Sequence, residues 1–315
     1  MRHLLAVLLC LAGSVFLAGE PANAAGLAFV LNSAGASISV IDMKTQTELR
    51  RIPALREPHH LVLSPDGREL LIGDTAGNEI LTLDPGTGAV LRRVPVVDPY
   101  QLGFSPDGKF LTVTGLARNQ IDILDPKTFA LKKRFPAKSM PSHLAYSPDS
   151  SMVFVTLQGT DSLMAIDLKT MTPRWTTPVG KTPAGVIWHN NTLLVANMGS
   201  DNVAIVDPID GRVTSRLITG KGAHTLFLSP DQRTLYVNNR VAGTTVALDA
   251  KTLKPVRTYM VSGGPDDIDF APDGKLWITR RFASRVALLD PVTGTTTDID
   301  VGRSPHGIWL NPRAP

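Results

Sequence analysis

The sequence predicts an all-β protein, a seven-bladed β-propeller of four-stranded antiparallel blades whose last strand closes the ring. Two repeated turns support this prediction. The first, Ser-Pro-Asp-Gly, occurs at residues 64–67 and 105–108 and, with changes, at 147–150, 229–231, 271–274 and 311–312. The second begins with an aspartate that recurs every 40 to 42 residues, at Asp42, Asp84, Asp125, Asp167, Asp207, Asp249 and Asp290. This spacing is close to the ~40–45 residues of a four-stranded propeller blade.

Each repeat divides into four short strands, as the second repeat illustrates. Residues 61–63 are expected to form the inner strand, followed by strands at 69–73, 79–83 and 89–95. Pro65 sets the φ angle of the first turn position, and Gly67 accepts the left-handed conformation that follows. No segment shows sustained 3.6-residue periodicity, so little helix is expected.

The two ends of the chain predict how the ring closes. The outer three strands occur seven times, beginning with residues 27–52, whereas the inner strand first occurs at His60 and last at residues 307–310. The first blade therefore lacks an inner strand at the N-terminus, and the C-terminus supplies it. Closure of this kind protects sheet edges that would otherwise promote aggregation. Residues 25–315 are predicted to form one domain.

Residues 1–24 have the features of a cleavable secretory signal. A short basic start precedes an apolar run over residues 4–17, and Ala22-Asn23-Ala24 supplies the small residues that a signal peptidase requires. The run is shorter than the roughly 20 residues of a membrane-spanning helix. We therefore expect a periplasmic or secreted protein with no membrane span in the mature chain.

Cleavage after Ala24 would remove Cys10, the single cysteine. Disulfides, thiolate metal sites, covalent haem attachment through cysteines and cysteine nucleophiles are then excluded together. The formal net charge of +4 is compatible with anionic partners but does not by itself indicate nucleic-acid binding.

The repeat resembles that of the YVTN-repeat β-propellers, within the group of exported propellers that includes cytochrome d1-like rings. Tyr236-Val237-Asn238-Asn239 comes nearest to the literal motif, and residues 154–156 and 194–197 are looser copies. The resemblance covers nearly all of the predicted mature chain and implies a seven-bladed, commonly exported ring. It does not imply one activity, because similar rings serve as binding proteins, lactonases, lyases and parts of redox enzymes.

Histidines concentrate in two adjacent columns at the start of the inner strands. The first column contains, in blade order, His59, Tyr100, Ser142, Ala184, His224, Asp266 and His306. With the predicted closure, His224, Asp266, His306 and His59 come from four consecutive blades and should converge at the channel mouth. His60, His143 and Asp267 occupy the second column, and strand alternation predicts that they point away from this group.

Three imidazoles and a carboxylate suit a Zn, Cu or Fe ion or an acid–base pair. A hydrogen-bonding rim for a ligand, or inert ring packing inherited from an ancestral blade, are the alternatives. The turn aspartates, by contrast, are expected to stabilise turns only.

Basic residues are predicted on the same face, in the loops that enter inner strands and in those that follow second strands. They are Arg56, Lys138, Lys181, Lys221, Arg303, Arg118, Arg240 and Arg281, with Asn197, Asn239 and Arg280 at ends of second strands. Acidic residues dilute this charge, but its balance is positive. An anionic ligand is the natural hypothesis, and an ordinary solvated surface is the alternative.

The leading hypothesis is an exported, non-enzymatic propeller that binds an anionic small molecule or another exported protein at this face. The predicted binding residues are His59, His224, Asp266, His306, Tyr100, His143, Asn197, Asn239, Arg280 and Arg281. The sequence requires no cofactor. It assigns no metal site either, but if a metal ion binds, the candidate ligands are the arc of His59, His224, His306 and Asp266. One alternative is a metal-assisted lyase or lactonase that uses this arc, since Pro305-His306-Gly307-Ile308 is similar to blade starts in antibiotic-lyase propellers. Another alternative is an accessory protein of a redox or haem system.

Overall fold

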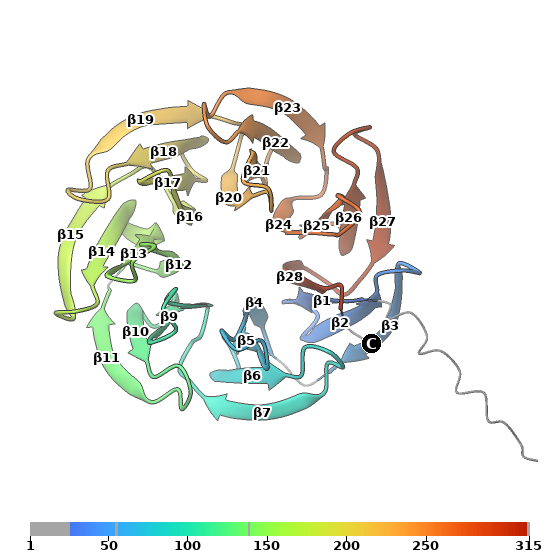
Figure 1. Ribbon diagram of the computed structural model, residues 1–315, viewed down its shortest axis with the longest axis horizontal. Coiled ribbons are helices and arrows are strands. Elements are labelled where there is room, and N and C mark those ends of the chain that lie inside the picture. The colour runs from blue at the N-terminus through green and yellow to red at the C-terminus, as the bar shows by residue number, and fades with distance from the viewer. Residues whose placement is uncertain (1–25, 54–55, 138, 314–315) are drawn as a thin grey trace, which may run out of the picture.

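The computed structural model describes residues 26–53, 56–137 and 139–313. In this part of the chain, strands assemble into seven four-stranded antiparallel sheets. The sheets are arranged as a ring around a central axis (Figure 1). The predicted signal peptide lies outside the described residues, as does Lys138. The predicted fold class is confirmed.

Each blade is built from strands that run in chain order from the channel outward, except that the inner strand of blade one comes last. Blade one contains β28 (Pro305–Asn311), β1 (Leu27–Asn32), β2 (Ser37–Asp42) and β3 (Thr47–Ile52). Blade two contains β4 (Pro58–Leu63), β5 (Leu70–Asp74), β6 (Glu79–Leu83) and β7 (Val90–Pro95). Blade three contains β8 (Gln101–Phe104), β9 (Leu111–Gly115), β10 (Gln120–Leu124) and β11 (Leu131–Pro136). Blade four contains β12 (Pro141–Tyr146), β13 (Met152–Leu157), β14 (Ser162–Asp167) and β15 (Thr172–Pro178). Blade five contains β16 (Pro183–His189), β17 (Thr192–Asn197), β18 (Asn202–Val206) and β19 (Val213–Ile218). Blade six contains β20 (Ala223–Leu228), β21 (Thr234–Asn239), β22 (Thr244–Asp249) and β23 (Pro255–Met260). Blade seven contains β24 (Pro265–Phe270), β25 (Leu276–Arg280), β26 (Arg285–Leu289) and β27 (Thr296–Asp300). A 3-10 turn at Gln158–Thr160 is the sole helical element of the described residues.

The C-terminal strand closes the ring as the sequence predicted. β28 pairs antiparallel with β1, and Phe29 lies opposite Trp309 in the register. The two aromatic rings stack with centroids 5.9 Å apart. Blade one is therefore held together by residues from both ends of the chain.

The hydrophobic core lies between the blades. Seven clusters of buried apolar side chains occur, one between each pair of neighbouring sheets. The cluster between blades one and two, for example, contains Phe29, Leu31, Ile72 and Leu81. The ring is thus a closed series of sheet-on-sheet contacts, and opening it at any point exposes apolar surface on two blades.

The repeated turns are stabilised by their own side chains. Ser64 Oγ donates to Asp66 Oδ1 at 2.7 Å, and Asp84 Oδ1 accepts from the backbone N–H groups of Gly86 and Thr87 at 3.0 and 2.7 Å. Hydrogen bonds from Thr87 lower the pKa of Asp84 below its usual value. These contacts account for the turn aspartates in structural terms.

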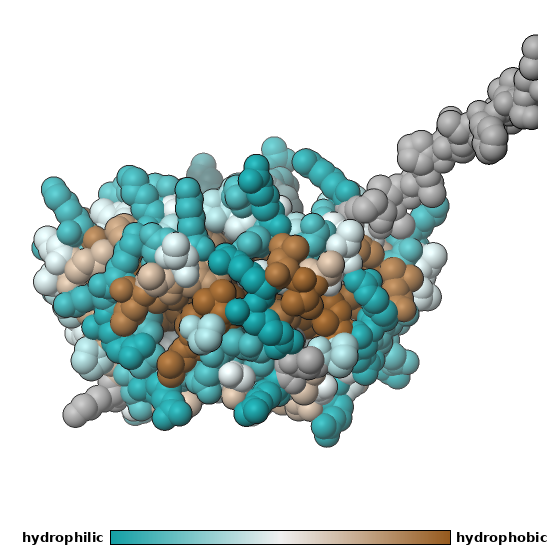
Figure 2. All heavy atoms as spheres, turned by 90° about the horizontal axis from the view of Figure 1, so that it is seen from below, coloured by the Kyte–Doolittle hydropathy of each residue, from teal (hydrophilic) through white to brown (hydrophobic). Residues whose placement is uncertain are grey.

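The outer strands form the rim of the disc, where apolar side chains lie among hydrophilic ones (Figure 2). Leu49, Val90, Leu91 and Leu131 are exposed there.

Over the described ranges, no helix combines the length and the apolar character needed to cross a bilayer.

Candidate functional site

Five histidine rings and one tyrosine ring meet where the inner strands begin, at one end of the central channel. His59 contacts Tyr100 and His306 with ring centroids 4.0 and 3.9 Å apart, and His60 lies 4.5 Å from His306 and 5.0 Å from His143. We call His59, His60, His143, His224 and His306 the histidine cluster. All five side chains are buried.

The predicted convergence of His59, His224, Asp266 and His306 is present, but the expectation that His60 and His143 of the second column point away from this group is wrong. His60 lies in the middle of the cluster, and the ring of His143 is 5.5 Å from that of His224. The reason is a β-bulge at the start of the inner strands. In β4, Pro58 pairs with Asp74 and Leu61 with Ile72, so that two residues, His59 and His60, lie opposite one. Strict alternation fails at a bulge, and both side chains can then face the channel.

Asp266 is the charged centre of this end of the channel. It is fully buried in β24. Its Oδ1 accepts from His224 Nδ1 at 2.8 Å and from Arg240, and its Oδ2 lies 3.4 Å from Arg281 Nη1 and 3.7 Å from His306 Nε2. One carboxylate therefore faces two guanidinium groups, which leaves an excess of positive charge.

The hydrogen bonds around His224 fix its tautomer. Arg240 Nη2 lies 2.7 Å from His224 Nε2 and 3.2 Å from Nδ1, and a guanidinium can only donate. Nε2 must then accept, so Nδ1 carries the hydrogen that is donated to Asp266. His224 is neutral in this arrangement and holds Arg240 against the carboxylate.

Burial and nearby positive charge both lower the pKa values of the histidine cluster. Burial, together with Arg240, lowers the pKa of His224 to about 4, and burial lowers that of His60 to about 3. Burial also lowers the pKa values of His59, His143 and His306 well below the usual value. Burial alone would raise the pKa of Asp266, but Arg240 and His224 hold it well below its usual range. At neutral pH the cluster is uncharged and Asp266 is ionised.

Several ring nitrogens of the histidine cluster are buried without a hydrogen-bond partner among the described residues. They are His59 Nδ1, His60 Nε2, His143 Nε2, His306 Nδ1 and His306 Nε2. An unsatisfied buried polar group costs about 1–3 kcal/mol. Inert ring packing would therefore destabilise the fold at several atoms at once.

Below the cluster, the channel contains a cavity of about 530 Å³ lined by the inner strands. His60 and His143 form part of its wall, with Asp267 and Asp269 from blade seven. Burial raises the pKa of Asp269 to about 6, and burial together with Asp266 raises that of Asp267 well above its usual value. Asp266 is thus ionised at neutral pH, whereas the two carboxyl groups that line the cavity have raised pKa values.

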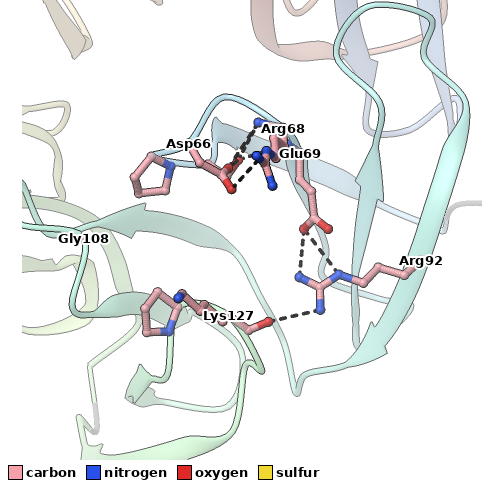
Figure 3. A pocket seen from close by; sticks show the side chains of 9 residues that line it. Asp66, Arg68, Glu69, Arg92, Gly108 and Lys127 are labelled. Carbon is pink, nitrogen blue, oxygen red and sulfur yellow. Dashed lines mark hydrogen bonds and ion pairs between the residues drawn. The ribbon is translucent and has the colours of Figure 1, made fainter.

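A larger hollow of about 680 Å³ lies between blades two and three, beside the Ser-Pro-Asp-Gly turns (Figure 3). Arg92 pairs there with Glu69 at 2.8 Å and donates to the Lys127 carbonyl oxygen at 3.2 Å. These contacts link two neighbouring blades. Among the described residues, none of those that line this hollow has a buried side-chain polar atom without a hydrogen-bond partner, whereas several at the channel mouth do. We therefore place the functional site at the mouth.

Three of the predicted binding residues lie apart from the cluster. Asn197 Nδ2 donates to Asn202 Oδ1 at 3.0 Å, Thr219 donates to Asn239 Oδ1 at 2.9 Å, and Arg280 contacts both oxygens of Asp298 at 2.6 Å. These contacts fasten strand ends and loops to one another. A binding role for the three residues stays a prediction.

The sequence places Arg240 only in the basic rim and does not predict the contact of its guanidinium group with Asp266. A signal was present in the repeat, because Arg240 follows β21 as Arg281 follows β25. Both residues occupy the same position in neighbouring blades, and both point to the carboxylate between them.

Comparison with known proteins places this architecture in a family. The model of the YNCE-like beta-propeller family matches residues 5–315, which is nearly the whole chain. The chain belongs to the YNCE-like beta-propeller family. Among curated proteins, no sequence matches this member of the family.

Solved structures of low sequence identity share the fold of this YNCE-like propeller. The periplasmic gluconolactonase PpgL of Pseudomonas aeruginosa is 19% identical, with a TM-score of 0.75 over 92% of this chain and 99% of that one. Hydrazine synthase of Kuenenia stuttgartiensis is 21% identical, with a TM-score of 0.70 over 82% of this chain and 90% of that one. The dihydro-heme d1 dehydrogenase NirN is 15% identical, with a TM-score of 0.68 over 94% of this chain and 78% of that one. At these identities the likeness concerns the fold alone.

Proposed function

We propose that this YNCE-like propeller is an exported binding protein that takes an anionic small molecule with an apolar portion at its channel mouth. The observation that carries the proposal is the pair of arginines around Asp266. Arg240 and Arg281 share one carboxylate, and their side chains keep 17% and 22% of their surface accessible. The excess positive charge attracts an anion, and the guanidinium groups can bind it in two-point fashion.

The residue that follows each arginine supports the apolar portion of the ligand. Val241 and Phe282 are 73% and 69% exposed. They occupy the same loop position in blades six and seven, and each lies against a glycine with φ +73°, Gly222 and Gly264. An exposed apolar pair next to a recessed cationic pair is complementary to an amphipathic anion. Because the guanidinium groups are recessed, a small anion fits them better than a broad protein surface.

Acid–base catalysis at the same place is less well supported. The His224–Asp266 pair resembles a carboxylate-oriented imidazole, which in hydrolases acts as a general base through its other nitrogen. Here Arg240 occupies that nitrogen at 2.7 Å. The geometry therefore favours binding over a lyase or lactonase reaction. Export is proposed on the predicted signal in residues 1–24, and one structural relative is described as periplasmic.

Calorimetric titration with octanoate tests this function, with octylammonium as the matched cation and acetate as the anion without a tail. Octanoate is expected to bind more tightly than either. Arg240→Gln and Arg281→Gln should each weaken octanoate about tenfold or more, because a charge-assisted hydrogen bond contributes about 1.5–3 kcal/mol. Lys275→Gln, on the opposite face, should not change the affinity. Equal binding of octanoate and octylammonium, or unchanged octanoate affinity in both arginine variants, would contradict the proposal.

A further inference from the structure

The histidine cluster contains ligand atoms for which the fold provides no internal partner. Two groups of three residues bring potential ligand atoms within 4.8 Å of one another: His59, His60 and His306, and His224, Asp266 and His306. His306 belongs to both groups. The structure therefore offers two alternative arrangements around a shared imidazole.

The second group is already engaged. His224 donates from Nδ1 to Asp266 and accepts at Nε2 from Arg240, and Asp266 also faces Arg281. An ion bound there would have to displace these contacts and would lie next to two guanidinium groups.

The first group is free to bind. Nδ1 of His59, Nε2 of His60 and both nitrogens of His306 have no hydrogen-bond partner within the described ranges. We infer that His59, His60 and His306 bind one divalent transition-metal ion, of the zinc or copper class, at the channel mouth. Neutral imidazole is a preferred ligand of these ions.

The geometry needs only small side-chain movements. A tetrahedral ion with bonds of about 2.0–2.1 Å to nitrogen places its ligand atoms roughly 3.4 Å apart. Atoms within 4.8 Å of one another reach this spacing by shifts of the order of 1 Å. Because burial keeps the pKa values of these three histidines low, no proton competes for the ligand nitrogens at neutral pH.

Neighbouring groups provide the support that metal-binding imidazoles commonly have. Asp266 Oδ2 lies 3.7 Å from His306 Nε2, so Nδ1 can bind the ion while Nε2–H turns to the carboxylate. Three imidazoles leave a tetrahedral ion with one further position for water or an anion.

Metal analysis of the full chain without a polyhistidine tag tests this inference. The buffer contains no carboxylate, so the result does not depend on whether the proposed anionic ligand binds. Protein stripped by a chelator is dialysed against Zn²⁺, separated from free ion and analysed for zinc. Wild-type protein is expected to retain about one ion per chain, and Co²⁺ should give the visible absorption of a tetrahedral nitrogen-bound ion. Wild-type protein that retains no stoichiometric ion would overturn the inference.

Variants then assign the ligands. His60→Gln should lose the retained ion, whereas His189→Gln should keep it, because His189 is a buried histidine outside the cluster that bonds to the Ala250 carbonyl oxygen at 2.6 Å. His224→Gln should also keep the ion, since its nitrogens are already engaged. Circular dichroism confirms that each variant is folded. Loss of the ion in His224→Gln together with retention in His60→Gln would refute the assigned ligand set.

Discussion

The substitution Asp266→Asn would preserve the size of the side chain but remove the charge that Arg240 and Arg281 share. Removing one partner of a buried ion pair costs about 3–5 kcal/mol, because the remaining charge is left uncompensated. Both arginines retain some contact with water, at 17% and 22% accessible side-chain surface, which reduces this cost. The amide oxygen of the new side chain could still accept from His224. We therefore expect Asp266→Asn to lower the free energy of unfolding by about 2–3 kcal/mol.

Urea unfolding followed by tryptophan fluorescence measures this change. Asp300→Asn is the matched control, because its carboxylate pairs with Arg285 at 2.9 Å but is 84% exposed. An exposed pair contributes about 0–1 kcal/mol, so this control should unfold close to wild type. In the double variant Asp266→Asn/Arg240→Gln, part of the loss should be recovered since one unpaired charge is gone. If Asp266→Asn is no less stable than Asp300→Asn, the idea of a charged centre at the mouth is wrong.

Two further predictions concern ring closure and pH. Deleting residues 307–315 removes most of β28 and should abolish cooperative thermal unfolding. The reason is that β1 loses its partner strand and two apolar clusters are exposed to water. Unchanged melting of the truncated chain would refute the closure. Burial raises the pKa of Asp269 from 3.8 to about 6, so between these pH values the folded state binds more protons than the unfolded state. The resulting stabilisation of the folded state, up to about 3 kcal/mol, is present below pH 4 and is lost as the pH rises through 6. Asp269→Asn should remove this part of the pH dependence, measured as unfolding free energy from pH 4 to 7, and an identical slope in the two proteins would contradict the assignment.

The fold was predictable from the sequence because propeller repeats encode their turns locally. Pro65 and Gly67 specify a turn whatever lies around them, and the same pattern recurs at a fixed spacing. The offset between the first inner strand and the first outer strands then predicted the pairing of β28 with β1. Tertiary context did not have to be known for either inference.

The site was predictable only in part, because it depends on bulges and on side-chain direction. Column position predicted that His59, His224 and His306 meet, but the bulge that turns His60 inward has no distinct signature in Pro58-His59-His60-Leu61. The inward direction of Arg240 likewise follows from the position of Asp266 in the next blade. Contacts across blades of this kind are set by packing geometry rather than by local sequence.

The position of His306 in β28 links the order of synthesis to the assembly of the site. His306 follows every other member of the histidine cluster in the sequence, so a chain emerging from a ribosome or an export channel contains an incomplete cluster until β28 has arrived. Bringing the two ends together is the most distant contact in the sequence and carries the largest loop-closure entropy. Any ligand that needs His306 binds the closed ring and not the open one, and so shifts the equilibrium toward closed blade one. An occupied mouth would therefore mark a molecule in which β28 has paired with β1 and blade one is closed.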